Sequence, residues 1–223
     1  MSAHEGSTVV REGGEEDVPA VDGRVPGRRG RRTRDRLLAA AADLLASRSY
    51  RDVTVVAIAR EVGTSPATFY QYFPSVEAAV QLLARRVAQE GARLAAPLDR
   101  DWRGRDAWDA STALVDAFLD FWRRNAAVLR VIDLAIAEGD PRFHDVRDDL
   151  LGPVGEQLVA TIGRRRGVSA AEARAETATL IAMLARVAEH QADLGAWGAD
   201  LDLVRLRLAE HVHWGVTGRR PRT

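Results

Sequence analysis

Cysteine and lysine are both missing from the 223 residues of this chain, so all 32 basic residues are arginine. Without cysteine the chain can form no disulfide, no thiolate metal site and no cysteine nucleophile, and it suits a reducing compartment. Long apolar runs are missing as well: no stretch approaches the roughly 20 residues that cross a bilayer, and residues 1–30 lack the apolar centre of a secretory signal. We therefore expect a cytoplasmic protein.

The motifs that mark common enzyme classes and cofactor sites are also lacking. The sequence holds no nucleophile-elbow glycines, no P-loop and no dinucleotide-binding fingerprint. His211 and His213, with His190 before them, come nearest to a metal-ligand pattern. Residues two apart on a helix point about 200° apart, so His211 and His213 cannot easily bind one ion. We expect no catalytic residue, no cofactor and no metal, and we interpret the pair as lying at the negative end of a helix.

What the sequence does contain is an uneven distribution of charge behind a net charge of zero. Residues 1–23 carry one arginine and six acids, and residues 24–86 carry twelve arginines and five acids. Residues 87–223 carry nineteen arginines and twenty-one acids. A basic stretch in the first third of an otherwise neutral chain is typical of a module that binds a polyanion such as nucleic acid.

Apolar residues recur at helical spacing through most of the chain. Residues 1–30 are the exception: they are rich in Gly, Glu, Asp and Arg, and we predict a disordered tail because they can bury too little apolar surface. From Thr33 onward apolar side chains fall on one helix face, beginning with Leu37, Leu38 and Leu44. No strand-like alternation occurs, so we predict an all-α protein of about nine helices.

Capping residues predict two short helices directly after the first helix. Thr54 can cap the second helix, and Gly63 stops it. Ser65 followed by Pro66 can start a third helix of about two turns, because proline at the first helical position costs no hydrogen bond. Two short helices joined by a glycine-bearing turn, with a helix before them, form the three-helix version of the helix-turn-helix, whose second short helix lies in the major groove of DNA.

The segment that begins at Thr54 resembles the signature of the TetR family of bacterial regulators. It reads TVVAIAREVGTSPATFYQYFPSVEA over residues 54–78, and the similarity extends over residues 33–82. Such a match in residue type and spacing is far more specific than a lone glycine fingerprint. The resemblance implies a DNA-binding domain at residues 31–78 and a larger helical domain for ligand binding and dimerisation at residues 79–223.

The resemblance also implies which residues contact DNA. In family members the third helix and the start of the second helix project side chains toward the duplex. Here the amide of Gln71 has the geometry to pair bidentately with adenine, whereas Thr64 and Tyr70 can donate to phosphate. Phe69 and Phe73 are expected to face inward. Together with residues of the basic run, the candidate DNA contacts are Arg32, Thr33, Arg34, Thr54, Thr64, Ser65, Ala67, Tyr70, Gln71 and Tyr72.

The chain departs from the family pattern in three places, which are Ser49, Pro66 and Val76. Val76 replaces a frequent lysine, and the arginine-rich run over residues 24–36 can compensate by reaching phosphates or the adjacent minor groove. Two interpretations of Arg24 to Arg29 stay open, contact with DNA or a solvated tail. We expect Arg32 and Arg34 to contact DNA.

The C-terminal half matches no tight motif, so its chemistry is inferred from residue types. Aromatic residues on apolar helix faces can line a cavity between helices, which is the usual form of a small-molecule site, although core packing is the competing interpretation. Asp116, Asp120 and Asp133 either anchor a polar ligand group or mark the solvent faces of their helices. The candidate ligand-binding residues are Trp108, Phe118, Phe121, Trp122 and Met183, with Trp102 beside them.

The final two long helices resemble the pair that forms the dimer interface of the family. Ala178, Ala182 and Ala185 lie at a spacing that permits close helix approach, and internal core is the competing interpretation. A two-fold dimer doubles the contacts that one recognition helix can make on a palindromic site.

Taken together, these features predict a homodimeric repressor that binds double-stranded DNA at a palindromic operator. A small apolar or amphipathic effector of unknown identity is expected to release it, and no membrane partner is expected. Two alternatives stay open. One is an activator or a regulator controlled by a protein partner, and the other is an all-helical enzyme with a vestigial helix-turn-helix, which would leave no operator footprint.

Overall fold

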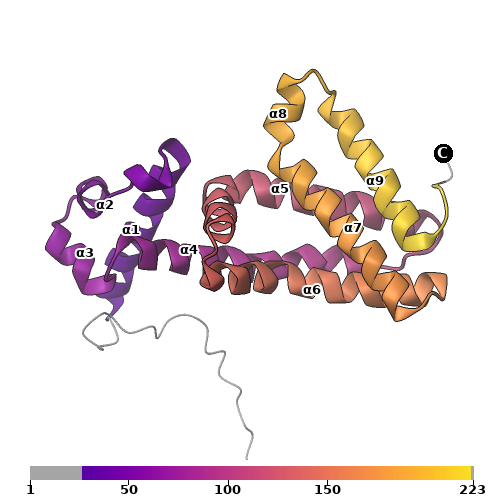
Figure 1. The fold of residues 1–223 in the computed structure, drawn as a ribbon, viewed down its shortest axis with the longest axis horizontal. Helices are drawn as coiled ribbons and strands as arrows, with labels where there is room; N and C mark the ends of the chain where they lie inside the picture. Colours follow the sequence, from indigo (N-terminus) through magenta and orange to yellow (C-terminus); the bar gives the residue numbers. More distant parts are fainter. Residues whose placement is uncertain (1–26, 222–223) are drawn as a thin grey trace, which may run out of the picture. The chain divides into compact units, whose positions relative to one another are not determined.

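The computed structural model describes residues 27–221, which fold into nine α-helices and two short 3-10 helices without any strand (Figure 1). The all-α prediction is therefore confirmed. Contacts divide the chain between Val80 and Gln81 into two compact units. We call them the N-terminal unit and the C-terminal unit and describe each by itself.

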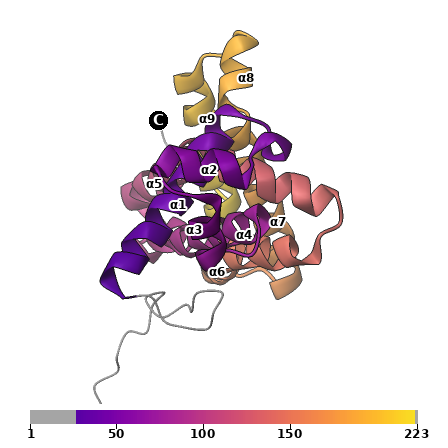
Figure 2. The ribbon, with the colours of Figure 1, turned by 90° about the vertical axis from the view of Figure 1, so that its left-hand side faces the viewer.

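The N-terminal unit is built from α1 (Arg28–Ser47), α2 (Val55–Val62) and α3 (Pro66–Tyr72), which pack against one another (Figure 2). A 3-10 turn, η1 (Tyr50–Asp52), joins the first two helices. The fully buried side chains of its core include Leu37, Leu38, Ile58 and Phe69.

The first helix begins five residues earlier than the sequence predicts, at Arg28 instead of Thr33. Arginine has a high helix propensity, so the basic run extends the helix although it adds no apolar face. Residues 28–30 of the predicted disordered tail are thus helical, and residues 1–26 lie outside the described residues.

Side-chain caps set the bounds of the short helices as predicted. Oγ1 of Thr54 accepts from the backbone N–H of Ala57 at 3.2 Å, and Oγ of Ser65 accepts from that of Thr68 at 3.2 Å. Gly63 ends α2 with a φ of 71°, in the left-handed region that glycine adopts without strain. These caps turn the chain sharply between α2 and α3.

Helix α4 (Val76–Gly91) crosses the division between the units and continues into η2 (Ala92–Asp99), a 3-10 helix that contains Pro97. Its last residue makes a close approach to α6 (Pro141–Arg166). A Cβ at position 91 would overlap Cδ1 of Leu150 and lie 3.1 Å from the Leu150 carbonyl oxygen. Only glycine therefore fits at the end of α4.

The C-terminal unit is organised around α5 (Gly104–Ala137), which packs against η2, α6, α7 (Ala170–Glu189) and α9 (Leu201–Thr217). Helix α5 is continuous over its 34 residues. A short helix, α8 (Gln191–Ala196), links α7 to α9. Both ribbon views show α8 and the start of α9 projecting beyond the rest of this unit (Figures 1 and 2).

Helix α6 runs through Gly152 and Pro153 without interruption. Pro153 is exposed, so its ring meets no packed neighbour and the carbonyl oxygen that loses its helical partner can bond to water. After the loop that follows α6, Ser169 and Glu172 form a capping box at the start of α7. No helix among residues 27–221 is both long and apolar enough to cross a membrane.

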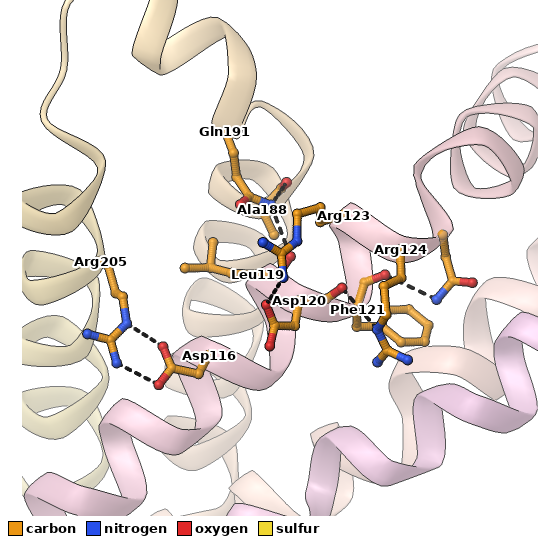
Figure 3. Close-up of polar contacts among 10 residues, drawn as sticks. Asp116, Leu119, Asp120, Phe121, Arg123, Arg124, Ala188, Gln191 and Arg205 are labelled. Atoms are coloured by element: carbon orange, nitrogen blue, oxygen red, sulfur yellow. Dashed lines mark hydrogen bonds and ion pairs between the residues drawn. The ribbon is translucent and has the colours of Figure 1, made fainter. Parts of the chain in front are cut away.

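Polar contacts fix α5 against the helices that close the unit (Figure 3). Arg205 of α9 holds the Asp116 carboxylate with two guanidinium nitrogens, one of them Nη2 at 2.6 Å from Oδ2. Nε2 of Gln191 donates to the carbonyl oxygens of Leu119 at 3.0 Å and Ala188 at 2.8 Å. The Asp116 carboxylate is thus taken up by an intramolecular ion pair.

Candidate functional site

Helix α3 packs against the rest of the N-terminal unit through the face that carries Phe69, and its opposite face is exposed to solvent. Phe69 is 0% exposed and Phe73 is 3% exposed, and their ring centroids lie 5.4 Å apart. Tyr70, between them in sequence, is 51% exposed. Both phenylalanines thus face inward as predicted, because residues four apart share a helix face. The residues of the opposite surface are Ser65, Ala67, Tyr70 and Gln71, which are exposed, and Thr64 and Tyr72, which are half-buried.

The start of α2 presents a second polar group to solvent. Thr54 is exposed, and its Oγ1 accepts from the backbone N–H of Ala57. The hydroxyl hydrogen remains available as a donor, and the helix dipole adds positive potential at this end. A phosphate oxygen is the type of group that such an end attracts.

Helix α1 carries a basic surface formed by Arg28, Arg31, Arg32 and Arg36. Nη2 of Arg36 donates to the carbonyl oxygen of Val62 at 2.8 Å, so this arginine also ties α1 to the end of α2. Arg32 is exposed. The surface therefore places guanidinium groups where a polyanion can meet them.

Beside this surface, Thr33 is half-buried, and its Oγ1 donates to the carbonyl oxygen of Arg29 at 3.1 Å.

The expectation that Arg34 contacts DNA is not supported, because its side chain does not belong to that basic surface. Its side chain is 6% exposed, and its guanidinium carbon lies 5.9 Å from the centroid of the Phe73 ring. Arg34 precedes Leu37 and Leu38 by three and four residues, so it shares their buried face of α1. That spacing is the signal in the sequence that could have placed Arg34 inside.

The C-terminal unit contains a cavity of about 690 Å³, a size typical of small-molecule sites. Trp102 and Trp108 form part of its wall, where α5 begins. His213 of α9 meets Trp108 edge to face, with ring centroids 6.1 Å apart. Burial lowers the pKa of His213, and the backbone carbonyl of Ala107 opposes this shift. The site is thus a polar and aromatic cavity with a neutral imidazole in its wall.

The five predicted ligand-binding residues do not line one cavity. Trp108 lines the cavity just described, and Trp122 lines a second one of about 360 Å³. Phe118 and Phe121 line neither, because they are buried against Trp122, with ring centroids 5.4 Å from it in both cases. Met183 also lines neither of the two. The competing interpretation, core packing, is the one that fits Phe118 and Phe121.

The second cavity carries charge that is already paired. Asp133 and Arg147 both line it and form an ion pair with each other. Burial raises the pKa of Asp133, and the Arg147 cation opposes this shift. Asp120 pairs with Arg123 at 2.6 Å on the surface of α5. Both carboxylates are therefore paired within the chain and are not free to anchor a polar group of a ligand.

Sequence reasoning missed several residues of the larger cavity. They come from three separate segments, so no local motif could mark them, and each has the residue type of an ordinary surface position in the sequence. The missed lining residues are Arg105, Arg165, Thr217, Arg219 and Arg220.

Several large apolar side chains are exposed along α9 and in the loop that precedes it, and we call them the apolar surface of α9. Trp197 is 84% exposed and Trp214 is 58% exposed. Large apolar side chains rarely gather on the surface of a chain that has no partner. The other exposed members of this apolar surface are Leu201, Leu203 and Leu206.

Two family models match the chain. One is described as bacterial regulatory proteins of the tetR family and matches residues 37–83, and the other is described as the tetracyclin repressor-like C-terminal domain and matches residues 94–223. The second match alone covers more than half of the chain. The chain belongs to the TetR family. In TetR terms, α2 and α3 are the helix-turn-helix, and α5 to α9 fall in the C-terminal domain.

Solved structures share this TetR fold at low sequence identity. The fatty acid degradation regulator FadR from Bacillus halodurans is 18% identical, with a TM-score of 0.63 over 89% of this chain and 100% of that one. A TetR-family transcriptional regulator from Streptomyces coelicolor is 16% identical, with a TM-score of 0.63 over 82% of this chain and 79% of that one. FadR from Bacillus subtilis, solved in complex with stearoyl-CoA, is 14% identical, with a TM-score of 0.62 over 83% and 99%. No curated relative matches the sequence.

Proposed function

We propose that this TetR-family protein is a cytoplasmic repressor, without catalytic activity, that binds a palindromic operator as a homodimer and leaves it when a small molecule binds. The observation that carries the proposal is the solvent-exposed face of α3, whose opposite face is fixed to the N-terminal unit by the buried ring of Phe69. DNA binding falls to residues 31–78, and effector binding and dimerisation fall to residues 79–223. The division of contacts between Val80 and Gln81 supports this assignment.

The exposed groups of α3 suit the two tasks of operator binding. Gln71 offers an amide to a base edge in the major groove, where bidentate pairing with adenine gives specificity. Tyr70 and Thr54 offer hydroxyl donors, and Arg32 offers a cation, for phosphates on either side. Phosphate contacts position the helix, and base contacts then select the sequence.

Dimerisation is proposed through the apolar surface of α9, which includes Trp197 in the loop before it. A second copy related by a two-fold axis would cover Trp197 and Trp214 and would supply a second α3 for the other half-site. The pair Leu203→Glu and Leu206→Glu places two charges in this surface, whereas Arg207→Glu alters an exposed neighbour that already pairs with Glu210. Sedimentation should find a dimer for the parent chain and a monomer for the double variant. A parent chain that stays monomeric would contradict the proposal.

Effector release is proposed to act by a shift between two conformations of the dimer. A ligand in the C-terminal unit would favour a spacing of the two recognition helices that no longer matches half-sites one DNA turn apart, roughly 34–36 Å. Such coupling typically amounts to about 1–3 kcal/mol, which lowers operator affinity by about 5- to 150-fold.

Fluorescence anisotropy with labelled DNA tests the function. A duplex that carries the intergenic palindrome next to the gene should bind much more tightly than a scrambled duplex of the same composition. A candidate effector should then weaken that binding. Equal affinity for both duplexes would overturn the regulator assignment, and an effector that strengthens binding would reverse the direction of regulation.

A further inference from the structure

The larger cavity of the C-terminal unit is lined by cations without a matching acid. Four arginines line it, and no aspartate or glutamate belongs to the described lining. Arg105, Arg219 and Arg220 are exposed, whereas Arg165 is half-buried and its Nε has no hydrogen-bond partner. A cavity with several cations and no counter-charge has a strong preference for an anion. The four residues are Arg105, Arg165, Arg219 and Arg220.

Buried polar atoms without a partner point to the same cavity. Trp102 is 2% exposed, and its Nε1–H has no hydrogen-bond acceptor. Nε–H of Arg165 is a second donor without an acceptor. Nδ1 of His213, a residue that is 7% exposed, also lacks a partner, but it is an acceptor, because the other ring nitrogen donates to the backbone carbonyl of Ala107. A buried donor without an acceptor costs stability, so such groups normally mark the place of a ligand or an ordered water. All three residues line the cavity.

The neighbour of Arg165 shows what a structural arginine does at this end of α6. Nη1 of Arg166 donates to Glu176 at 2.9 Å and to the carbonyl oxygen of Gly215 at 3.0 Å, and so ties α6 to α7 and α9. Arg165 makes no such bond and lines the cavity instead. Its charge is therefore not needed to hold these three helices together.

The first turn of α5 adds donors to the same wall. Arg103 stands at the N-cap of α5 and forms no side-chain cap, so backbone N–H groups of the first turn have no side-chain acceptor. Gly104 and Arg105 of that turn line the cavity. Trp108 supplies an aromatic surface beside them, so an anionic group and a flat apolar body can be held together.

We propose that this cavity binds a small organic anion, with a carboxylate or phosphate group between the arginines and Trp102 and a flat apolar body against Trp108. The inference rests on the proposed function, because it names the chemical class of the effector. The anion accepts from the Trp102 indole and from guanidinium groups of Arg105 and Arg165. A neutral molecule of the same shape leaves those donors unpaired.

Calorimetry with three matched probes and no DNA tests the site. The probes are naphthalene-2-carboxylate, 2-naphthyl phosphate and the neutral 2-naphthylmethanol. At least one anion should bind about tenfold or more tightly than the alcohol, as expected for charge-assisted hydrogen bonds, and the better of the two identifies the acidic group. Equal binding of the alcohol, or no binding of either anion, would overturn the proposal.

Variants locate the binding within the chain. Arg165→Gln should weaken the preferred anion by about 10- to 100-fold and leave the alcohol unchanged. Arg164→Gln is the matched control, because Arg164 is exposed, bonds to Thr161 and does not line the cavity. Arg105→Gln is a second cavity variant, at an exposed position of α5. Its result stays informative even if Arg165→Gln disturbs the folding of α6. If both cavity variants bind the anion as the parent does, the site lies elsewhere.

The same probes in the operator assay separate this inference from the proposed function. If an anion binds in calorimetry but leaves operator affinity unchanged, the anion site stands and its role as the effector site is overturned. If only the neutral alcohol releases the protein from the operator, the repressor assignment stands and the proposal of an anionic effector is overturned. A chain that binds the anion but no operator retains the anion site and overturns the proposed function.

Discussion

The guanidinium carbon of Arg34 lies 5.9 Å from the centroid of the Phe73 ring. This contact joins α1 to the residue that directly follows α3, the exposed helix of the helix-turn-helix. An arginine in a basic run thus serves the packing of the N-terminal unit, while Arg32, two residues earlier, stays exposed. The two side chains should respond to mutation in opposite ways.

Arg34→Ala should lower the free energy of unfolding by about 1–2 kcal/mol, because it removes a desolvated cation–π contact and the packing of a long side chain. Urea denaturation measures this decrease. Arg48→Ala, at the exposed end of the same helix, is the control and should stay within about 0.5 kcal/mol of the parent. An unchanged stability for Arg34→Ala would mean that the buried contact contributes nothing.

Arg32→Gln should leave stability unchanged and flatten the salt dependence of operator binding. Each phosphate that the protein no longer neutralises changes the slope of log affinity against log salt concentration by about 0.9. Anisotropy titrations between low and moderate salt measure that slope, with Arg48→Gln as a control that removes the same charge. A slope equal to that of the parent would remove Arg32 from the DNA-binding residues.

Gln71→Ala should cost about 1–3 kcal/mol of operator affinity and relax the preference at one base pair of each half-site. Affinity for a set of operators substituted at single positions measures both effects. Glu61→Ala changes an exposed residue of α2 outside the proposed contacts and serves as the control. A uniform decrease on all duplexes would reassign Gln71 to a phosphate.

The ion pair between Asp116 and Arg205 should contribute little, although both guanidinium contacts are well directed (Figure 3). Their side chains are 41% and 42% exposed, so solvent screens the attraction. A double-mutant cycle with Asp116→Asn and Arg205→Gln should give a coupling of about 1 kcal/mol or less. A larger coupling would indicate that the pair is shielded in solution, as by a second protein copy.

Acidification should destabilise the C-terminal unit through His213. Burial lowers the pKa of this side chain below its ordinary value of 6.5, so the unfolded state takes up a proton before the folded state does. The stability that neutral His213 contributes is present above pH 6.5 and is lost as the pH falls through that value toward the lowered pKa. Denaturation at pH 7.5 and pH 5.5 should therefore show a smaller difference for His213→Phe than for the parent. An equal difference would place the sensitivity at another group.

Local signals in the sequence predicted the short helices of the N-terminal unit and its buried aromatic residues. Thr54 and Ser65 cap helices because their hydroxyl oxygens accept from backbone N–H groups three residues away, and this needs no tertiary information. Phe69 and Phe73 are buried because they repeat at helical spacing. The prediction for Arg34 was wrong because its charge is a weaker guide than its place on the same helix face as Leu37.

The larger cavity of the C-terminal unit could not be predicted, because it depends on distant segments. Trp102 precedes α5, Arg165 ends α6 and His213 lies in α9, and no pattern in the sequence tells which of their atoms meet. The aromatic residues chosen from periodicity include Phe118 and Phe121, which fill the core instead. Periodicity identifies the buried face of a helix but cannot separate a packed face from a cavity wall.

The glycine at the end of α4 has a mechanical consequence. The side chain of Leu150 in α6 fills the space that a side chain at position 91 would need. Helix α6 therefore cannot move closer to the end of α4 without displacing α4. The cavity takes Arg165 from the last turn of α6, and α4 begins before the division at Val80. A displacement of α6 toward position 91 would therefore push directly on the end of α4.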